Sequence, residues 1–231
     1  MMQIRRAADR GYFDHGWLKT HHTFSFADYH DPAHMGFSAL RVINDDWIAP
    51  HQGFGTHGHR DMEILTYMVS GVLTHRDSMG HEQTLVHGEV QRMSAGTGVR
   101  HSEINEGDQP VRLLQIWLLP EEQGINPRYG QKRFDLEAGH GHFTLLASRD
   151  GAEGSLTIHQ DVRVYRGLLD SGQALEQALD VGRRHWIQMV DGTVHLNGEL
   201  LHPGDGIALI GETSMMIEAQ ENAELLWFDL A

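Results

Sequence analysis

The sequence predicts an all-β protein built from two tandem antiparallel β-barrels of the jelly-roll type. Short apolar runs recur about every ten residues with glycine, proline or asparagine turns between them, as in barrels and sandwiches. No helical periodicity alternates with these runs, which argues against a βαβ fold. There is also a partial internal repeat, since the run Val190–Gly198 resembles the run Val69–Asp77.

The composition limits the size and the partners of the protein. With 231 residues, the chain has room for one large β domain or two domains of about 100 residues. The net charge of −14 argues against binding to nucleic acid or to an anionic membrane surface. Cysteine is absent, which excludes disulfides, thiolate metal ligands and thiol nucleophiles, whereas 18 histidines are present.

The N-terminal segment Met1–Arg10 has no apolar core like that of a signal peptide. No stretch approaches the roughly 20 apolar residues of a membrane span. We therefore expect a cytoplasmic protein without a membrane partner. Nothing in the sequence specifies an oligomer, so a monomer is the default expectation.

Strand signals in the first half become regular after residue 50. The expected strands are His15–Leu18, Thr23–Ala27, Gly36–Asn44, Glu63–Val69, Val72–Asp77, Gly88–Met93, a strand around His101, and Val111–Leu119. Residues 120–140 change character. Because Gly/Ser repeats are missing there, we expect an ordered linker.

A second series of strands begins near Phe143. The expected strands are Leu156–Asp161, Val162–Arg166, Trp186–Val190, Thr193–Leu196, and two core strands around Met215-Met216 and Leu225–Phe228. The pair Asn197-Gly198 predicts a hairpin turn, and Gln173–Leu179 predicts one short helix. We expect a first domain at 1–135, which includes the linker, and a second at 136–231.

Four side chains of metal-ligand type follow glycines in two short stretches of the sequence. His57 and His59 alternate, and so do His101 and Glu103, so each pair shares one face of a β-strand. If the two strands are close together inside a barrel, three imidazoles and one carboxylate converge on a metal site. Glu63 has the parity of the first two histidines, so spacing alone leaves open which glutamate supplies the carboxylate.

The patterns Gly53–Glu63 and Gly88–Glu103 resemble the two motifs of the cupin superfamily. Four further stretches are similar to the pirin branch of that superfamily: Phe24–Phe26, Gly36–Val42, Ala95–Gly98 and Gln115–Trp117. The second half, with His159–Asp161, resembles bacterial pirin-like proteins assigned as quercetin 2,3-dioxygenases. The resemblance covers essentially the whole chain.

The resemblance implies a bicupin whose N-terminal barrel holds one divalent transition metal through His57, His59, His101 and Glu103. It favours Glu103 over Glu63 as the ligand, which leaves Glu63 to line the pocket or to orient a histidine. It also implies that the C-terminal barrel has lost its metal, and no His-x-His pattern occurs after residue 142. We expect Fe(II), although the ligand set also suits Ni, Mn, Co, Cu and Zn.

The resemblance further implies a dioxygenase that opens a flavonol ring with O2 and releases carbon monoxide. The partners would then be a small aromatic substrate and O2. Metal coordination would lower the pKa of the flavonol hydroxyl, and Glu103 is the family-based candidate for the catalytic base. An apolar pocket would hold the rings, with Phe54, Met93 and Trp117 as candidates for its walls.

Two alternatives to this activity stay open. One is a cupin enzyme that acts on another small molecule. The other is a metal-binding, pirin-type regulatory module that docks a protein partner. An open coordination position beside an apolar cavity favours an enzyme, whereas a filled site and a large exposed apolar patch favour the regulatory module.

The remaining histidines are expected to be structural or exposed. We expect surface or loop positions for His75, His81, His87, His140 and His142. We expect structural roles for His159, His185, His195 and His202.

Overall fold

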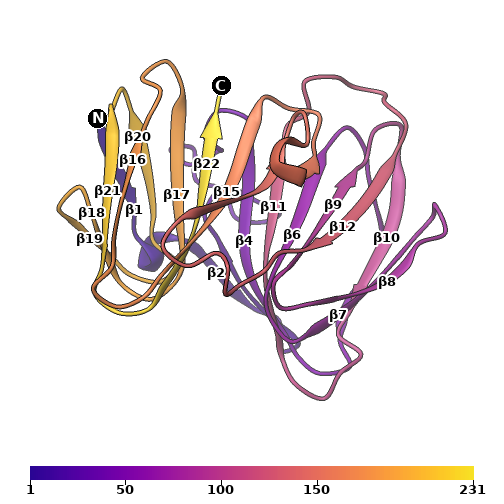
Figure 1. Cartoon of the computed structure of the whole chain (residues 1–231). Helices are drawn as coiled ribbons and strands as arrows, with labels where there is room; N and C mark the ends of the chain where they lie inside the picture. Colours follow the sequence, from indigo (N-terminus) through magenta and orange to yellow (C-terminus); the bar gives the residue numbers. More distant parts are fainter. The chain divides into compact units, whose positions relative to one another are not determined.

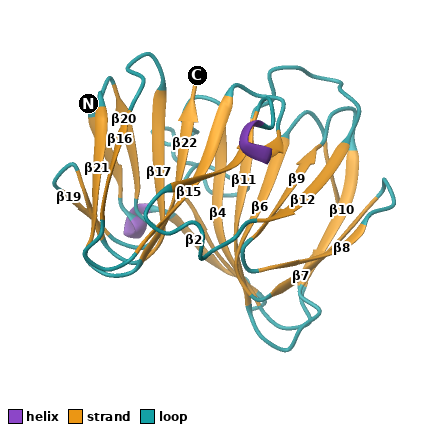
Figure 2. Cartoon of the chain, viewed as in Figure 1, coloured by secondary structure: helices purple, strands orange, loops and turns teal.

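The computed structural model describes all residues, 1–231, and its regular elements are almost all β-strands (Figure 2). The strands are numbered β1 to β22, and the only helices are two 3-10 turns, η1 (Ala7–Asp9) and η2 (Ala152–Gly154). No helix is long and apolar enough to cross a membrane.

The chain forms two compact units. The first unit comprises Gly11–Phe134 together with Ile158–Gln160. The second unit comprises Met1–Arg10, Asp135–Thr157 and Asp161–Ala231.

The first unit contains a seven-stranded and a four-stranded antiparallel sheet (Figure 1). In spatial order, the larger sheet is β12 (Arg128–Arg133), β9 (Glu89–Ser94), β6 (Glu63–Ser70), β11 (Val111–Leu118), β4 (Leu40–Ile48), β3 (Leu18–His22) and β2 (Gly11–Asp14). The smaller sheet is β5 (Gly53–His59), β10 (Val99–Ile104), β7 (Val72–Asp77) and β8 (Glu82–Val86).

The second unit repeats this arrangement of seven and four strands. Its larger sheet is β1 (Met2–Arg5), β20 (Gly206–Ile210), β17 (Arg184–Asp191), β22 (Ala223–Leu230), β15 (Val162–Leu169), β13 (Phe143–Ser148) and β14 (Leu156–Thr157). Its smaller sheet is β16 (Ala174–Ala178), β21 (Ser214–Ala219), β18 (Val194–Leu196) and β19 (Glu199–Leu201). The predicted all-β bicupin fold is confirmed.

The division into units differs from the predicted domains 1–135 and 136–231 at two places. Met1–Arg10 belongs to the second unit because β1 pairs with β20, from Met2 opposite Leu209 to Arg5 opposite Gly206. His159 belongs to the first unit, and its backbone carbonyl accepts a hydrogen bond of 2.8 Å from the backbone N–H of Glu121.

Three predictions of strands or helices are wrong. His15–Leu18 connects β2 to β3, and only Leu18 lies in a strand. Gln173–Leu179 contains no helix, because Ala174–Ala178 form β16, which pairs with β21 and alternates between exposed and partly buried positions. The linker predicted at 120–140 is ordered, as expected, but it also contains β12, which pairs with β9 at the edge of the larger sheet. Thr23–Ala27 form a bend and a turn instead of a strand.

The hairpin predicted at Asn197-Gly198 is confirmed. These two residues connect β18 and β19, whose last pair is Leu196 opposite Glu199. Asn197 has a φ of 47° and Gly198 a φ of 86°. Positive φ at both central residues is what a two-residue turn of type I′ requires.

The interiors of the two units differ. The first unit has two separate apolar clusters, one around Leu73 and Leu113 and the other around Ile64 and Met93. The second unit has one continuous apolar cluster of fifteen buried residues, which includes Trp227. A divided interior leaves room for polar groups and a cavity in the first unit.

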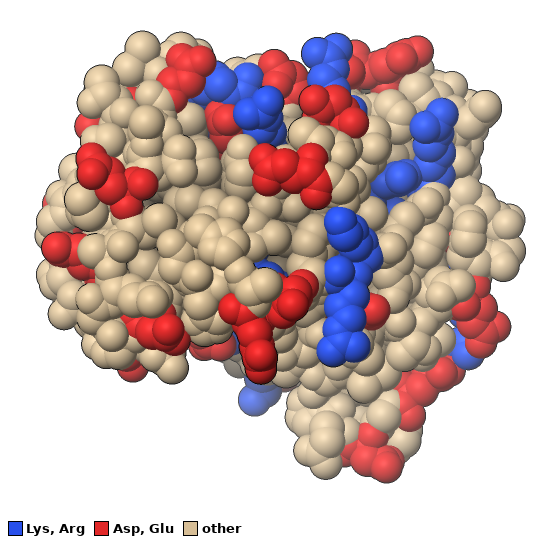
Figure 3. Space-filling view, in the orientation of Figure 1, with Lys and Arg blue, Asp and Glu red and all other residues tan.

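The visible face carries charged side chains of both signs, and several Lys and Arg side chains form one column on it (Figure 3). Asp and Glu are spread over this face, with the other Lys and Arg side chains in small groups among them. This distribution is consistent with the acidic net charge of −14.

Candidate metal centre

Two adjacent strands of the smaller sheet in the first unit bring three histidines together. His57 and His59 lie on β5, and His101 lies on β10 directly opposite His57. The ring centroids are 4.4 Å apart for His57 and His101, 4.8 Å for His57 and His59, and 5.0 Å for His59 and His101. The three imidazoles therefore form one cluster.

The ring nitrogens of this cluster are suited to a divalent metal ion. Their ligand atoms lie within 4.8 Å of one another. His57 Nδ1 lies 2.8 Å from the carbonyl oxygen of Gly55, which leaves Nε2 for a metal. Both ring nitrogens of His101 are buried without a hydrogen-bond partner. Because buried polar atoms normally have a partner, a metal ion fits this position.

Burial keeps two of these imidazoles neutral. It lowers the pKa of His59 to about 4 and that of His101 to about 3, and the neighbouring imidazoles add to the effect. A histidine binds a metal as the neutral imidazole. Both side chains are therefore in the ligand form at neutral pH.

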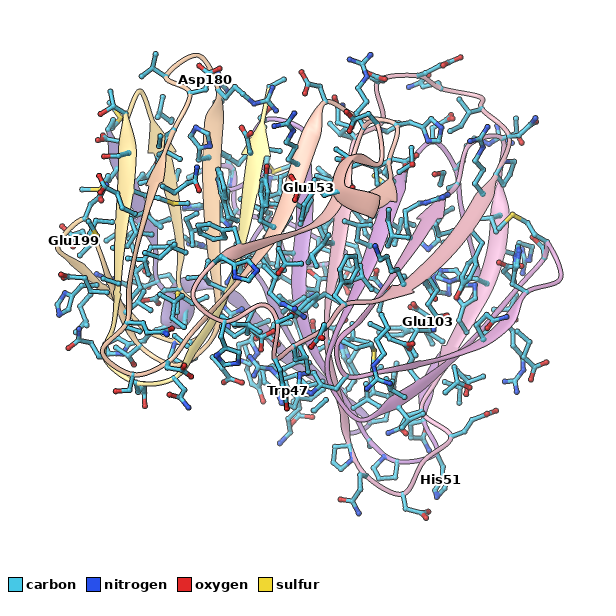
Figure 4. The ribbon with its side chains drawn as sticks, viewed as in Figure 1. Trp47, His51, Glu103, Glu153, Asp180 and Glu199 are labelled. Carbon is cyan, nitrogen blue, oxygen red and sulfur yellow. The ribbon has the colours of Figure 1, made fainter.

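Glu103 lies inside the first unit, two residues beyond His101 (Figure 4). Thr66 Oγ1 donates a hydrogen bond of 3.1 Å to Glu103 Oε1, and Gln115 Nε2 donates one of 3.0 Å to Glu103 Oε2. The pairing of β10 with β5 shifts register between His101 and Glu103. Glu103 groups with His101 and a fourth histidine, His75, and not directly with the two histidines of β5.

His75 was expected at the surface or in a loop, and that prediction is wrong. It is fully buried on β7, opposite Glu103. Its Nε2 lies 3.2 Å from Asp77 Oδ2, and its Nδ1 is buried without a partner. Histidines at metal sites typically have one ring nitrogen hydrogen-bonded to a carboxylate. The available sequence signal was His75-x-Asp77, which puts both side chains on one face of a strand.

Asp77 is itself held in place. Its Oδ1 accepts hydrogen bonds from the backbone N–H groups of Met79 (2.9 Å) and His81 (3.0 Å). Burial alone would raise the pKa of Asp77, but hydrogen bonds from His81 and His75 outweigh it and hold the pKa below its ordinary value. A charged carboxylate therefore orients His75.

Glu63 belongs to a different group of side chains. It is buried, and Ser94 Oγ donates a hydrogen bond of 2.9 Å to its Oε2. His159 Nδ1 lies 3.3 Å from its Oε1. Burial raises the pKa of Glu63, although Ser94 and His159 oppose the rise. Its ligand atoms are not among those that converge with the histidine cluster.

The other histidines mostly have the expected positions. His87, His140 and His142 are exposed, while the side chain of His81 is 40% exposed. His185 is buried against Trp227.

A cavity of about 420 Å³ lies beside the candidate metal centre. Its lining includes the aromatic side chains of Trp17, Phe26, Phe54 and Trp117 and the metal-side residues His57, His59 and Glu103. The rings of Trp117 and His59 meet edge to face at 4.9 Å. Of the three predicted wall residues, Phe54 and Trp117 line the cavity, whereas Met93 packs with Trp117 in an apolar cluster.

A row of polar side chains crosses the larger sheet of the first unit. In register from β3 to β12 it consists of His22, Asn44, Gln115, Thr66, Gln91 and Gln131. Along β6, Thr66 lies between Ile64 and Met68 on the same face, so the row separates the two apolar clusters. Sequence analysis missed this row because it depends on the register of six strands.

The fold and the site define a two-barrel cupin protein with a candidate centre for a divalent metal ion. The family model described as Pirin matches residues 2–118, and the model described as Quercetinase C-terminal cupin domain matches residues 145–230. The chain belongs to the pirin family.

Close relatives extend over the whole chain. It is 51% identical over 232 residues to a protein of Escherichia coli (strain K12) named quercetin 2,3-dioxygenase, covering 100% of this chain and 99% of that one. It is 44% identical over 220 residues to a pirin-like protein of Caulobacter vibrioides, covering 94% of each.

One solved structure bears directly on the metal. The bacterial pirin YhhW of Escherichia coli in complex with nickel(II) matches with a TM-score of 0.95 and 48% identity, covering 100% of this chain and 99% of that chain. Together with the His/Glu groups, these relatives support a cupin metalloenzyme that uses a divalent metal ion.

Proposed function

We propose that this protein is a metal-dependent dioxygenase of the quercetinase type, which opens a flavonol ring with O2 and releases carbon monoxide. The observation that carries the proposal is the group of histidines and Glu103 at the edge of a cavity with aromatic walls. The name quercetin 2,3-dioxygenase of the 51% identical relative adds support.

The cavity suits a small aromatic substrate. Its volume of about 420 Å³ lies within the range of small-molecule sites, which is about 300–1,000 Å³. Phe54 and Trp117 line it on the side of the histidines, and Trp17 contacts Phe54 edge to face at 5.3 Å. These walls hold planar rings and exclude water from the reacting end.

We assign the metal ligands as His57, His59, His101 and Glu103. Fe(II) is the expected ion, and Ni, Mn, Co, Cu and Zn also suit this donor set. When bound, the ion supplies Lewis-acid polarisation of the substrate hydroxyl. Three neutral imidazoles and one carboxylate leave such a site with a charge of about +1, which favours an anionic oxygen donor.

The protein side chains position the substrate and move its proton. Glu103 accepts the hydroxyl proton on one of its carboxylate oxygens. Thr66 and Gln115, which donate to Oε1 and Oε2, fix the direction of the carboxylate. Trp117 packs against His59 and so limits the movement of that ring.

The cavity also distinguishes the alternatives. It favours an enzyme over the regulatory module, because a docking role requires no ligand-sized space beside the metal ligands. An enzyme that acts on another small molecule has the same structural support, so turnover has to separate it from the flavonol dioxygenase.

The proposal is tested by turnover with defined metals. The metal-free protein is loaded separately with Fe(II), Ni, Mn, Co and Cu, and flavonol absorbance is followed in air together with carbon monoxide release. We expect metal-dependent decay with carbon monoxide as a product. His101→Ala removes a central ligand and abolishes it, while His87→Ala, at an exposed position outside the site, retains it.

Stoichiometric metal binding without turnover by any of the five metals would refute the flavonol dioxygenase. That result would favour an enzyme that acts on another small molecule, or the regulatory module. Turnover that survives His101→Ala would refute the assigned site.

A further inference from the structure

We propose that the cavity contains a second polar subsite, formed by Thr20, Asn44 and Asp46, that binds hydroxyl groups at the end of the substrate away from the metal ligands. The inference rests on the proposed function, because it concerns a ligand of the same cavity. The chemical class it selects is a planar aromatic molecule with a metal-binding hydroxyl at one end and neutral hydroxyl groups at the other.

The three residues belong to one face of two neighbouring strands. Thr20 on β3 lies directly opposite Asp46 on β4. Asn44 precedes Asp46 by two residues, so both side chains point to the same face of β4. All three line the cavity, and they are 3%, 4% and 3% exposed for Thr20, Asn44 and Asp46.

Each residue has a buried polar atom without a hydrogen-bond partner of normal geometry, although Thr20 and Asp46 are close enough to interact with each other. These atoms are Thr20 Oγ1, Asn44 Oδ1 and Asp46 Oδ1. Such atoms are uncommon in protein interiors, and three on one cavity wall call for an explanation. A ligand that donates and accepts hydrogen bonds along this wall provides one.

The polar row shows a contrast along its length. Nearer the metal ligands, Gln115 and Thr66 donate to Glu103, so their polar groups are used within the protein. Asn44 is the next member of the row after Gln115, and its Oδ1 is unused. Within this cavity, unused oxygen atoms therefore occur on β3 and β4, and the wall on β11 adds the unpartnered Nε1 of Trp117.

Charge on this wall selects against anionic ligands. Asp45, on the other face of β4, is paired with Arg112 at 3.1 Å, but no cation pairs with Asp46. Burial raises the pKa of Asp46 to about 7, a side-chain hydrogen bond with Thr20 opposes part of the rise, and the charges of Asp45 and Glu103 add to it. A carboxyl of this kind can donate to a carbonyl or accept from a hydroxyl, whereas a ligand carboxylate or sulfate would meet repulsion.

An apolar ligand end is also disfavoured. It would cover the three polar atoms without pairing them, and unpaired buried groups carry a free-energy cost. A site built to bond a hydroxyl therefore rejects the analogue that lacks it more strongly than an apolar pocket rejects an added group. The subsite favours polyhydroxylated rings over unsubstituted ones.

The test compares two flavonols that share the metal-binding hydroxyl. Quercetin carries further ring hydroxyls, and 3-hydroxyflavone carries none. Their affinities for the Ni(II)-loaded full-length protein are measured without oxygen, so that binding is separated from turnover. We expect the protein to prefer quercetin by about tenfold or more.

Variants then locate the preference. Thr20→Val and Asp46→Leu lower the ratio of the two affinities towards one, whereas Asp46→Asn, which keeps a donor and an acceptor, retains more of the ratio. Thr84→Val, at an exposed position on β8, is the matched control and keeps it unchanged. Metal content and thermal unfolding of each variant show that the site is still formed.

The outcomes separate this inference from the proposed function. Preferential quercetin binding that depends on Thr20 and Asp46 supports the subsite even where no turnover occurs. Turnover without any preference, or an equal loss of both affinities in the variants, overturns the subsite and leaves the dioxygenase standing. Failure of both flavonols to bind overturns the subsite as well.

Discussion

Replacing Gln115 by Met tests whether Glu103 is a metal ligand. The change conserves the side-chain volume and removes the hydrogen bond of 3.0 Å from Gln115 Nε2 to Glu103 Oε2. Both residues are buried, at 8% and 1% exposure, so bulk solvent screens this hydrogen bond little. The carboxylate is then held by Thr66 alone, and the metal ion has to order it on binding.

The magnitude follows from the strength of that bond. A hydrogen bond to a charged group contributes about 1.5–3 kcal/mol. Since about 1.4 kcal/mol corresponds to a factor of ten in affinity, we expect the Kd for Ni(II) to rise about ten- to hundredfold. Losses of this size are typical when a group that orients a metal ligand is removed.

The assay is a competition for Ni(II) between the protein and a chromophoric chelator at neutral pH. Gln83→Met, at an exposed position on β8, is the matched control and should leave the Kd unchanged. Glu63→Gln should also leave it unchanged, because Glu63 is held by Ser94 and His159. A folded Gln115→Met variant with the original Kd would refute the reasoning, and a loss in Glu63→Gln would move the ligand role to Glu63.

Three further predictions concern residues around the site. In the metal-free protein, the folded state holds the Asp46 proton up to about pH 7, whereas the unfolded chain loses it near pH 3.8, so stability falls as pH rises through this window. The side chain of Asp46→Asn does not titrate. The free energy of unfolding of this variant, measured with urea and compared with that of the unchanged protein, should therefore increase from pH 4 to pH 8 by up to about 4 kcal/mol. A difference between the two proteins that is constant with pH would contradict this. His75→Ala should raise the Kd for Ni(II) about tenfold, while His142→Ala should not change it, and equal values for both would remove His75 from the metal environment. Gly96→Ala should lower the midpoint of thermal unfolding, because Gly96 has a φ of 45° and a Cβ would lie 2.0 Å from the carbonyl oxygen of Ile125; Gly80→Ala, with a φ of 93° and open space, controls for the strain alone.

The local part of the site was predictable because strand geometry is simple. The spacing of His57 and His59 and of His101 and Glu103 is enough to put each pair on one face of a strand. The same rule applied to His75-x-Asp77 would have predicted another inward pair. The motif alone is a weak signal, because no glycine-rich turn precedes it and the family resemblance assigns it no role.

The rest of the site depends on pairing between distant strands. That Gln115 and Thr66 hold Glu103 follows from the register of β11 with β6, and a shift by one residue would turn these side chains away. No local pattern fixes this register. The same applies to β16, whose polar sequence suggested a helix until its pairing with β21 decided the conformation.

The two units show how one architecture supports two kinds of interior. The order β16-β21-β18-β19 in the second unit matches β5-β10-β7-β8 in the first. On the second strand of this sheet, Ile217 lies opposite Leu175 and is buried in the continuous apolar cluster, where the first unit has His101 opposite His57. Alkyl side chains offer no lone pair to a metal, but they give a continuous core that the first unit lacks. The chemistry therefore depends on the inward positions of one four-stranded sheet, and not on the fold that both units share.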